Sequence, residues 1–167
     1  MSAVAPESHK REPHQGVAPQ SAKAGFPRRL RLLRHADFDR VYELGRRHFS
    51  ASLTVFYWAR PEADSAAKKS VGSSGLRIGF TVGRALGGAV QRNRMKRRLR
   101  EAVRLSPPPA GLKVDVVINP KKSLLSADFA AVLNEVRRAF VVIEQKLAGN
   151  AEGKSTSGAK KSPGPVS

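Results

Sequence analysis

The spacing of apolar side chains along the chain predicts an alternation of helices and strands. Steps of three and four residues indicate helices, and alternating or continuous apolar runs indicate strands. The predicted helices span 35–44, 88–105 and 126–147, and the predicted strands span 50–59, 76–83 and 113–119. Ser126 is the expected N-cap of the last helix.

The order of these elements, α-β-β-α-β-α, predicts a single small two-layer α+β domain with helices packed on one sheet. Residues 76–119 form a strand–helix–strand unit, and the usual handedness of such units predicts a right-handed crossover. Three further segments, 1–25, 61–75 and 149–167, are rich in Pro, Ala, Gly, Ser or Lys and poor in large apolar side chains. We therefore expect disordered tails around a folded domain at 26–148, which carries a flexible loop at 61–75.

Charge changes this picture from a generic small domain to a binding protein. The chain has 31 Lys and Arg residues against 13 Asp and Glu, a formal net charge of +18. Most of this excess lies within 26–148, so a polyanionic partner is expected to bind the folded domain. The absence of cysteine excludes disulfides, zinc-finger sites and a thiol nucleophile. With no apolar run long enough for a membrane span or a signal peptide, we expect a cytoplasmic protein.

The helix predicted at 88–105 has one apolar face and one strongly basic face. Its expected packing face comprises Met95, Leu99, Ala102 and Val103. The opposite arc comprises Asn93, Arg97, Arg100 and Arg104. Seven basic residues and a single acid lie between 92 and 104, so mutual repulsion on this helix requires an external anion.

Nucleic acid is the favoured partner of this helix, with no preference between RNA and DNA. A localisation signal and a membrane-surface helix are the alternatives, although the latter would need bulkier apolar residues. Gly87 and Gly88 would allow a phosphate to approach the N–H groups at the start of the helix.

Aromatic residues suggest a second surface. Phe56 and Trp58 share one face of their predicted strand with Thr54, whereas Leu53, Val55 and Tyr57 occupy the other. Either helices cover both faces of the sheet, or one face is open for stacking on single-stranded nucleic acid. In the second case, Arg77 and Thr81 on the next strand would contact phosphate and sugar.

No catalytic site is recognisable in the sequence. His35 and His48 lack a matching carboxylate cluster, and Asp37 and Asp39 are expected on different faces of one helix. No metal-ligand spacing, phosphate loop or nucleophile motif is present. We therefore expect neither catalytic residues nor a metal site in the polypeptide.

The run GFTVGRALGGAVQRNRMKRRLREAVR at 79–104 resembles the signature of the bacterial ribonuclease P protein component. FPRRLRLLRHADFDRVYELGRR is similar to the opening segment of that family, and LKVDVVINPK to its later strand. The resemblance covers about residues 26–147. It implies an α-β-β-β-α-β-α fold with a left-handed crossover, contrary to the general rule.

The resemblance also implies a function: the subunit of a ribonucleoprotein that removes the 5′ leader from precursor tRNA. In this family the RNA subunit performs the hydrolysis with Mg²⁺. The protein binds that RNA and the single-stranded leader, which broadens and tightens substrate binding. The implied partners are the catalytic RNA and precursor tRNA, with no membrane, DNA or obligate protein partner.

Site residues follow from the resemblance position by position. The motif that contacts the catalytic RNA matches Arg92, Asn93, Arg94, Lys96, Arg97 and Arg100. The cleft that holds the leader matches Phe38, Tyr42, Phe56, Thr81 and Arg84. The family often has two lysines where this chain has Arg84-Ala85, so one cationic contact is expected to be lost.

Two other functions remain open on the residues alone. One is a structural RNA-binding protein of the ribosomal type, without a role in processing. The other is a DNA-binding regulator, for which only Gln91 and Asn93 offer base-reading amides among the arginines.

Overall fold

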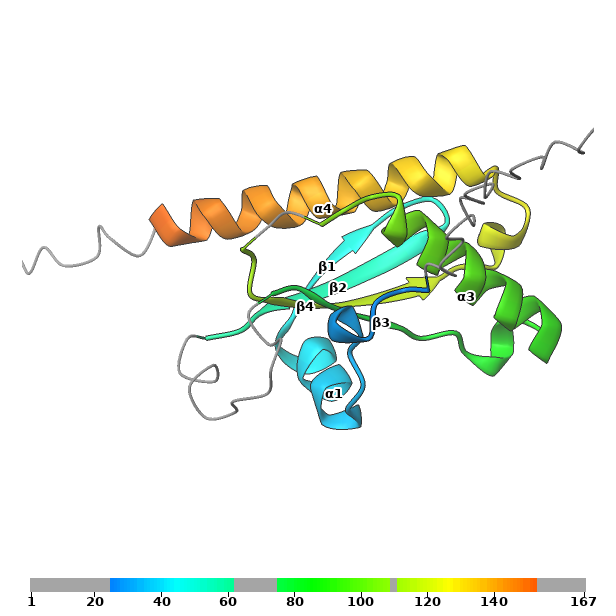
Figure 1. Ribbon diagram of the computed structural model, residues 1–167, viewed down its shortest axis with the longest axis horizontal. Helices are drawn as coiled ribbons and strands as arrows, with labels where there is room; N and C mark the ends of the chain where they lie inside the picture. Colours follow the sequence, from blue (N-terminus) through cyan, green and yellow to red (C-terminus); the bar gives the residue numbers. More distant parts are fainter. Residues whose placement is uncertain (1–24, 62–74, 109–110, 153–167) are drawn as a thin grey trace, which may run out of the picture.

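A four-stranded sheet forms the centre of the protein (Figure 1). The computed structural model describes residues 25–61, 75–108 and 111–152. The strands are β1 (Arg46–Phe49), β2 (Leu53–Ala59), β3 (Arg77–Phe80) and β4 (Val114–Pro120), in the spatial order β1-β2-β4-β3. β2 pairs antiparallel with both β1 and β4, whereas β3 runs parallel to β4.

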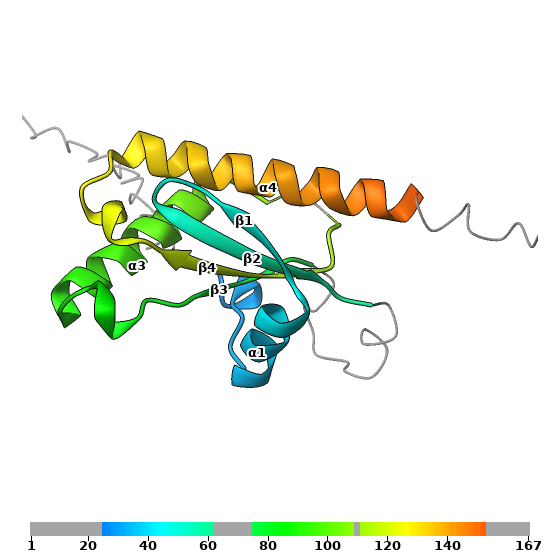
Figure 2. The same ribbon diagram turned by 180° about the vertical axis from the view of Figure 1, so that it is seen from behind.

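Helices cover both faces of this sheet (Figures 1 and 2). The α-helices are α1 (His35–Leu44), α3 (Ala89–Arg104) and α4 (Phe129–Glu152), and the short 3-10 helices are η1 (Arg28–Leu30), η2 (Arg84–Leu86) and η3 (Lys122–Leu125). α3 and α4 lie on one face and α1 on the other. The predicted α+β domain is confirmed, and α1 adds a smaller third layer to the expected two.

The main core lies between the sheet and the pair α3 and α4. β2 directs Leu53, Val55 and Tyr57 into it, as the alternation of its sequence predicts. The apolar face expected for α3 is confirmed, because Met95, Leu99, Ala102 and Val103 are all buried there. Burial of these side chains is the principal stabilising term for the domain.

The sequence patterns miss one strand and misplace one helix start. β1 has the sequence RRHF and is largely exposed at the sheet edge, so it shows no apolar alternation. Its presence gives the order α-β-β-β-α-β-α that the family resemblance implies. Ser126 does not cap the last helix, which begins at Phe129; it follows η3, and its hydroxyl donates to the Ser123 carbonyl within η3.

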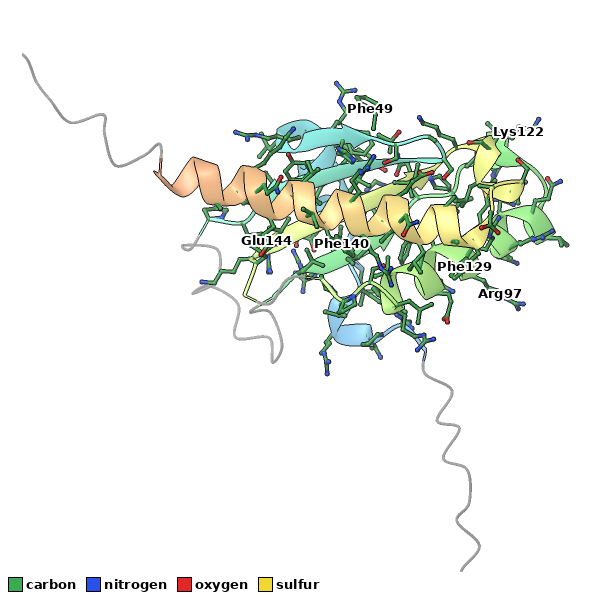
Figure 3. All side chains as sticks on the ribbon, turned by 90° about the horizontal axis from the view of Figure 1, so that it is seen from above. Phe49, Arg97, Lys122, Phe129, Phe140 and Glu144 are labelled. Atoms are coloured by element: carbon green, nitrogen blue, oxygen red, sulfur yellow. The ribbon has the colours of Figure 1, made fainter. Side chains whose placement is uncertain are left out.

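The connection from β3 through α3 to β4 is left-handed (Figures 1 and 3). The right-handed crossover expected from the general rule is therefore wrong for this chain. A right-handed connection between the same strands would place α3 on the face that α1 covers. Met95 and Leu99 would then be separated from the core that they share with α4.

A smaller apolar cluster lies on the other face, under α1. Leu32, Val41 and Val117 are buried there, and three half-buried aromatic side chains pack against them: Phe38, Phe56 and Trp58. Gly79 of β3 allows the Phe38 ring to lie against the backbone of the sheet, because a Cβ at this position would lie 2.5 Å from Cε1 and Cζ of Phe38.

Gly79→Ala is therefore expected to displace the Phe38 ring and to destabilise the domain by about 1–3 kcal/mol, the usual cost of overpacking. Urea unfolding of the two proteins measures this difference. Gly83→Ala is the matched control, since no atom lies within 4 Å of a Cβ built there. Equal stability of the Gly79 variant and the parent would contradict the packing of Phe38 described above.

Three predicted segments lie wholly or mainly outside the described residues. The N-terminal tail at 1–25 and the loop at 61–75 fall in undescribed parts of the chain apart from their end residues. The C-terminal tail predicted at 149–167 begins too early, because α4 continues to Glu152. The rest of that segment is not described.

Candidate RNA-binding surfaces

The first candidate surface is the solvent-facing side of α3, which we call the basic surface. It comprises Arg92, Asn93, Arg94, Lys96, Arg97 and Arg100. Asn93, Arg94, Arg97 and Arg100 are exposed, and Arg92 and Lys96 are half-buried. Figure 3 shows Arg97 directed away from the body of the protein. The helix therefore presents several arginines at spacings that suit successive phosphates.

Two arginines of α3 are used inside the protein. Arg98 donates hydrogen bonds to the carbonyls of Leu124, Leu125 and Ala127, which lie in and after η3. Arg104 pairs with Glu101 on the same helix, and this hydrogen bond lowers the pKa of the Glu101 carboxyl. Arg104, expected in the polycationic arc, is thus compensated by a neighbour.

The start of α3 is also occupied by a side chain. The Gly88 N–H donates to Oε1 of Gln91 at 3.2 Å, and Gln91 lies directly against Gly87, whose φ of 133° suits glycine. The Gly87 N–H donates to the Arg84 carbonyl. A phosphate expected at these two glycines would therefore have to displace existing hydrogen bonds.

The second candidate surface, which we call the aromatic face, lies where α1 meets the sheet and includes Tyr42, Phe56 and Thr81. The Tyr42 hydroxyl lies 2.9 Å from Oγ1 of Thr81 and 3.0 Å from Oδ1 of Asn119. The rings of Tyr42 and Phe56 meet edge to face with their centroids 4.9 Å apart. The structure thus brings together three residues matched by the resemblance, Tyr42, Phe56 and Thr81, from three separate segments.

The other two matched residues differ from these three in their surroundings. Phe38 is half-buried against Gly79 and supports the face from beneath, which limits its contact with a ligand. Arg84 is exposed on η2, just beyond Thr81. Its side chain is therefore accessible to solvent and lies close in sequence to Thr81.

Sequence patterns missed two members of this face. Asn119 shares a side of β4 with Val117, and its position after an apolar run is the only available signal. Arg47 lies on the undetected strand β1, with its guanidinium carbon 5.9 Å from the centroid of Phe56. A cation beside an aromatic ring favours the binding of a base and its phosphate.

Arg77 does not contribute to this face as predicted. Its guanidinium donates to both Asp115 oxygens, at 2.8 and 2.5 Å, and to Oδ2 of Asp37 at 3.1 Å. Burial alone would lower the pKa of Arg77, but hydrogen bonding and attraction to Asp115 and Asp37 raise it above the usual value. Arg77 therefore fixes α1 to the sheet instead of contacting phosphate.

No catalytic cluster is formed by the titratable side chains of the described segments. The two histidines have different surroundings: His35 pairs with Asp39 on α1, whereas His48 lines a hollow beside α4. Burial, then repulsion by Lys146 and Arg138, lowers the pKa of His48 and favours its neutral form. Glu135 in the same hollow already accepts hydrogen bonds from the Ser52 N–H and hydroxyl.

In the described part of the chain, no group of three His, Cys, Asp or Glu side chains is placed to hold a metal ion. No helix in that part is both long and apolar enough to cross a membrane.

The fold and the two surfaces define a small α+β protein with features suited to binding nucleic acid, and comparisons with known proteins identify its family. The ribonuclease P family matches residues 26–144. The ribonuclease P protein component of Desulfovibrio desulfuricans is 37% identical over 128 residues, which cover 75% of this chain and 92% of that protein. That of Gluconacetobacter diazotrophicus is 38% identical over 109 residues, covering 65% and 85%.

Solved structures agree with this assignment. The RNase P protein from Thermotoga maritima superposes with a TM-score of 0.52 at 26% identity, covering 66% of this chain and 94% of that one. The chain belongs to the ribonuclease P protein component family. It is therefore a subunit of the ribonucleoprotein endoribonuclease that processes tRNA.

Proposed function

We propose that the basic surface binds the catalytic RNA and that the aromatic face binds the single-stranded 5′ leader of precursor tRNA. The observation that carries this division is the separation of the two surfaces by the sheet. α3 lies on one face with α4, whereas Tyr42, Phe56 and Thr81 lie on the face of α1. One protein molecule can then hold both RNAs at once.

The chemistry of each surface suits its proposed ligand. The α3 arginines offer planar donors to the phosphates of a folded RNA. The aromatic face offers Phe56 and Tyr42 for stacking and the polar atoms of Thr81 and Asn119 for contacts with sugar or base. Holding the leader would tighten binding of precursor tRNA over mature tRNA, which lacks it.

Hydrolysis is assigned to the RNA partner with Mg²⁺ held by RNA. This assignment follows from the family to which the chain belongs. The protein's own contribution is to neutralise phosphates and to position the leader. The cytoplasm is the proposed location, consistent with a cysteine-free chain.

A cleavage assay on precursor tRNA at low Mg²⁺ tests the proposal. It compares this protein alone, a bacterial catalytic RNA alone, and the two combined. Cleavage at the mature 5′ end only in the combined reaction is the expected result. Cleavage by the protein alone would reveal an active site in the polypeptide, and RNA binding without cleavage in any mixture would favour a structural RNA-binding protein.

Phe56→Ala is expected to weaken binding of precursor tRNA to the holoenzyme by about 1–3 kcal/mol, the contribution of one stacked base. Binding of mature tRNA should not change, because the contact is made to the leader. Direct binding measurements on both tRNAs give the comparison. Leu33→Ala is a suitable control. Leu33 is also an exposed apolar residue, but it lies in the segment before α1 and is not a member of the aromatic face. Equal losses for the two tRNAs would remove Phe56 from the leader site.

A further inference from the structure

We propose that the leader continues across the sheet to the edge strand β1, where Phe49 stacks on a base and Lys121 contacts a phosphate. This inference rests on the proposed function, which places the leader on the aromatic face. Phe49 and Lys121 are not among the residues matched by the family resemblance. The proposal therefore adds a second stacking position, farther along the leader.

The strand register places Phe49 in line with the aromatic face. Phe49 pairs with Thr54 of β2, and Thr54 pairs with Asn119 of β4. The Thr81 N–H donates to the Ile118 carbonyl at 3.1 Å, which carries the β3–β4 pairing one residue past Phe80. Because directly paired residues project from the same side of a sheet, these four residues form one row across it. Tyr42 already contacts this row at Thr81 and Asn119.

Exposure and charge at the end of the row favour a ligand there. Phe49 is 65% exposed, against 36% for Tyr42, so its ring is available for stacking. Figure 3 places it at the β1 edge of the sheet. Lys121, two residues after Asn119, is exposed, and its ammonium donates to the Ser50 carbonyl at 2.6 Å. The two remaining N–H donors of that ammonium can bind a phosphate beside Phe49.

The hairpin that carries Phe49 is held in place on both sides. The Lys121 N–H donates to the Ser52 carbonyl at 2.8 Å, and Ser52 donates twice to Glu135 of α4. The Ser123 hydroxyl donates to the Ala51 carbonyl at 3.2 Å. A ligand therefore meets a pre-ordered aromatic ring, and little conformational entropy is lost on binding.

The length of the row decides which nucleotides reach Phe49. Three strand spacings separate Thr81 from Phe49, or about 14 Å. This exceeds the rise of about 3.4 Å for one stacked nucleotide several-fold, so the two positions contact nucleotides several places apart. A short leader that fills the Tyr42 end cannot also reach Phe49. The contribution of Phe49 must therefore depend on leader length.

The test measures precursor tRNA binding by the reconstituted holoenzyme, with leaders of about two and about ten nucleotides. Phe49→Ala is expected to weaken binding of the long-leader substrate by about 5- to 150-fold, the range for one lost base stack. The short-leader precursor and mature tRNA should bind as they do to the parent. Phe49→Tyr should retain binding, whereas Phe49→Leu, which is apolar but not aromatic, should lose it. Lys121→Gln should reproduce part of the loss and reduce the salt dependence.

The controls separate this inference from the proposed function on which it rests. Val141→Ala removes an exposed apolar side chain from α4 and should change nothing. Loss of leader binding in Phe56→Ala without any effect of Phe49→Ala would overturn the inference alone. No leader effect in either variant would overturn both. Equal effects of Phe49→Ala on all three tRNAs, or weaker binding of the catalytic RNA instead, would show that the leader does not occupy this edge.

Discussion

Replacing Arg97 and Arg100 together with Gln is expected to weaken binding of the catalytic RNA by on the order of 100-fold or more. Both side chains are exposed, and neither pairs with an acid among the described residues. A hydrogen bond to a charged group contributes about 1.5–3 kcal/mol, so two lost phosphate contacts amount to at least about 3 kcal/mol. The logarithmic salt slope of binding should flatten by about 1.4–1.8.

Arg104→Gln is the matched control within the same helix. Its charge is already compensated by Glu101, so both affinity and salt slope should change little. Urea unfolding should show that none of these exposed substitutions disturbs the fold. An unchanged salt slope in the double variant would mean that α3 does not face RNA phosphates.

The basic surface could be predicted from sequence because helical periodicity separates the buried face of α3 from its exposed face. Four apolar residues at steps of three and four mark the buried side of α3, and the structure buries all four. Helical periodicity does not show which groups each guanidinium contacts. Arg98 and Arg77 are both used by groups distant in sequence, the carbonyls after Leu124 and the carboxylate of Asp115. Only the tertiary fold reveals that these two charges are unavailable to a ligand.

The aromatic face was less predictable for a related reason. Its polar members come from strand register, which brings Asn119 beside Thr54 although each lies in its own apolar run. β1 adds Arg47, but a strand with two arginines in four residues shows no apolar alternation that would predict it. The handedness of the β3–α3–β4 crossover is likewise a tertiary property. Here the shared burial of α3 with α4 outweighs the general preference for a right-handed connection.

Arg77→Met is expected to lower the free energy of unfolding by about 3 kcal/mol, near the lower end of the cost of breaking a buried ion pair. The Asp115 carboxylate is fully buried and loses two hydrogen bonds, while Asp37 loses its link to the sheet. Arg60, with Nε 3.3 Å from Asp115, retains part of the compensation and keeps the loss from being larger. Urea unfolding of the isolated protein gives this value.

Addition of Asp115→Asn separates the ion pair from simple loss of packing. In Arg77→Met, the buried Asp115 carboxylate loses its guanidinium partner. The double variant has no carboxylate at position 115, so it does not carry this unpaired charge. Its loss should therefore be smaller than the sum of the two single losses, by about 0.5–3 kcal/mol. Strict additivity would show that the two groups do not interact.

RNA affinity distinguishes the sequence-based prediction for Arg77 from the structural one. If Arg77 contacts phosphate, Arg77→Met lowers RNA affinity and the salt slope of binding while the free energy of unfolding stays unchanged. Because the guanidinium lies between Asp37 and Asp115, we expect the stability loss instead.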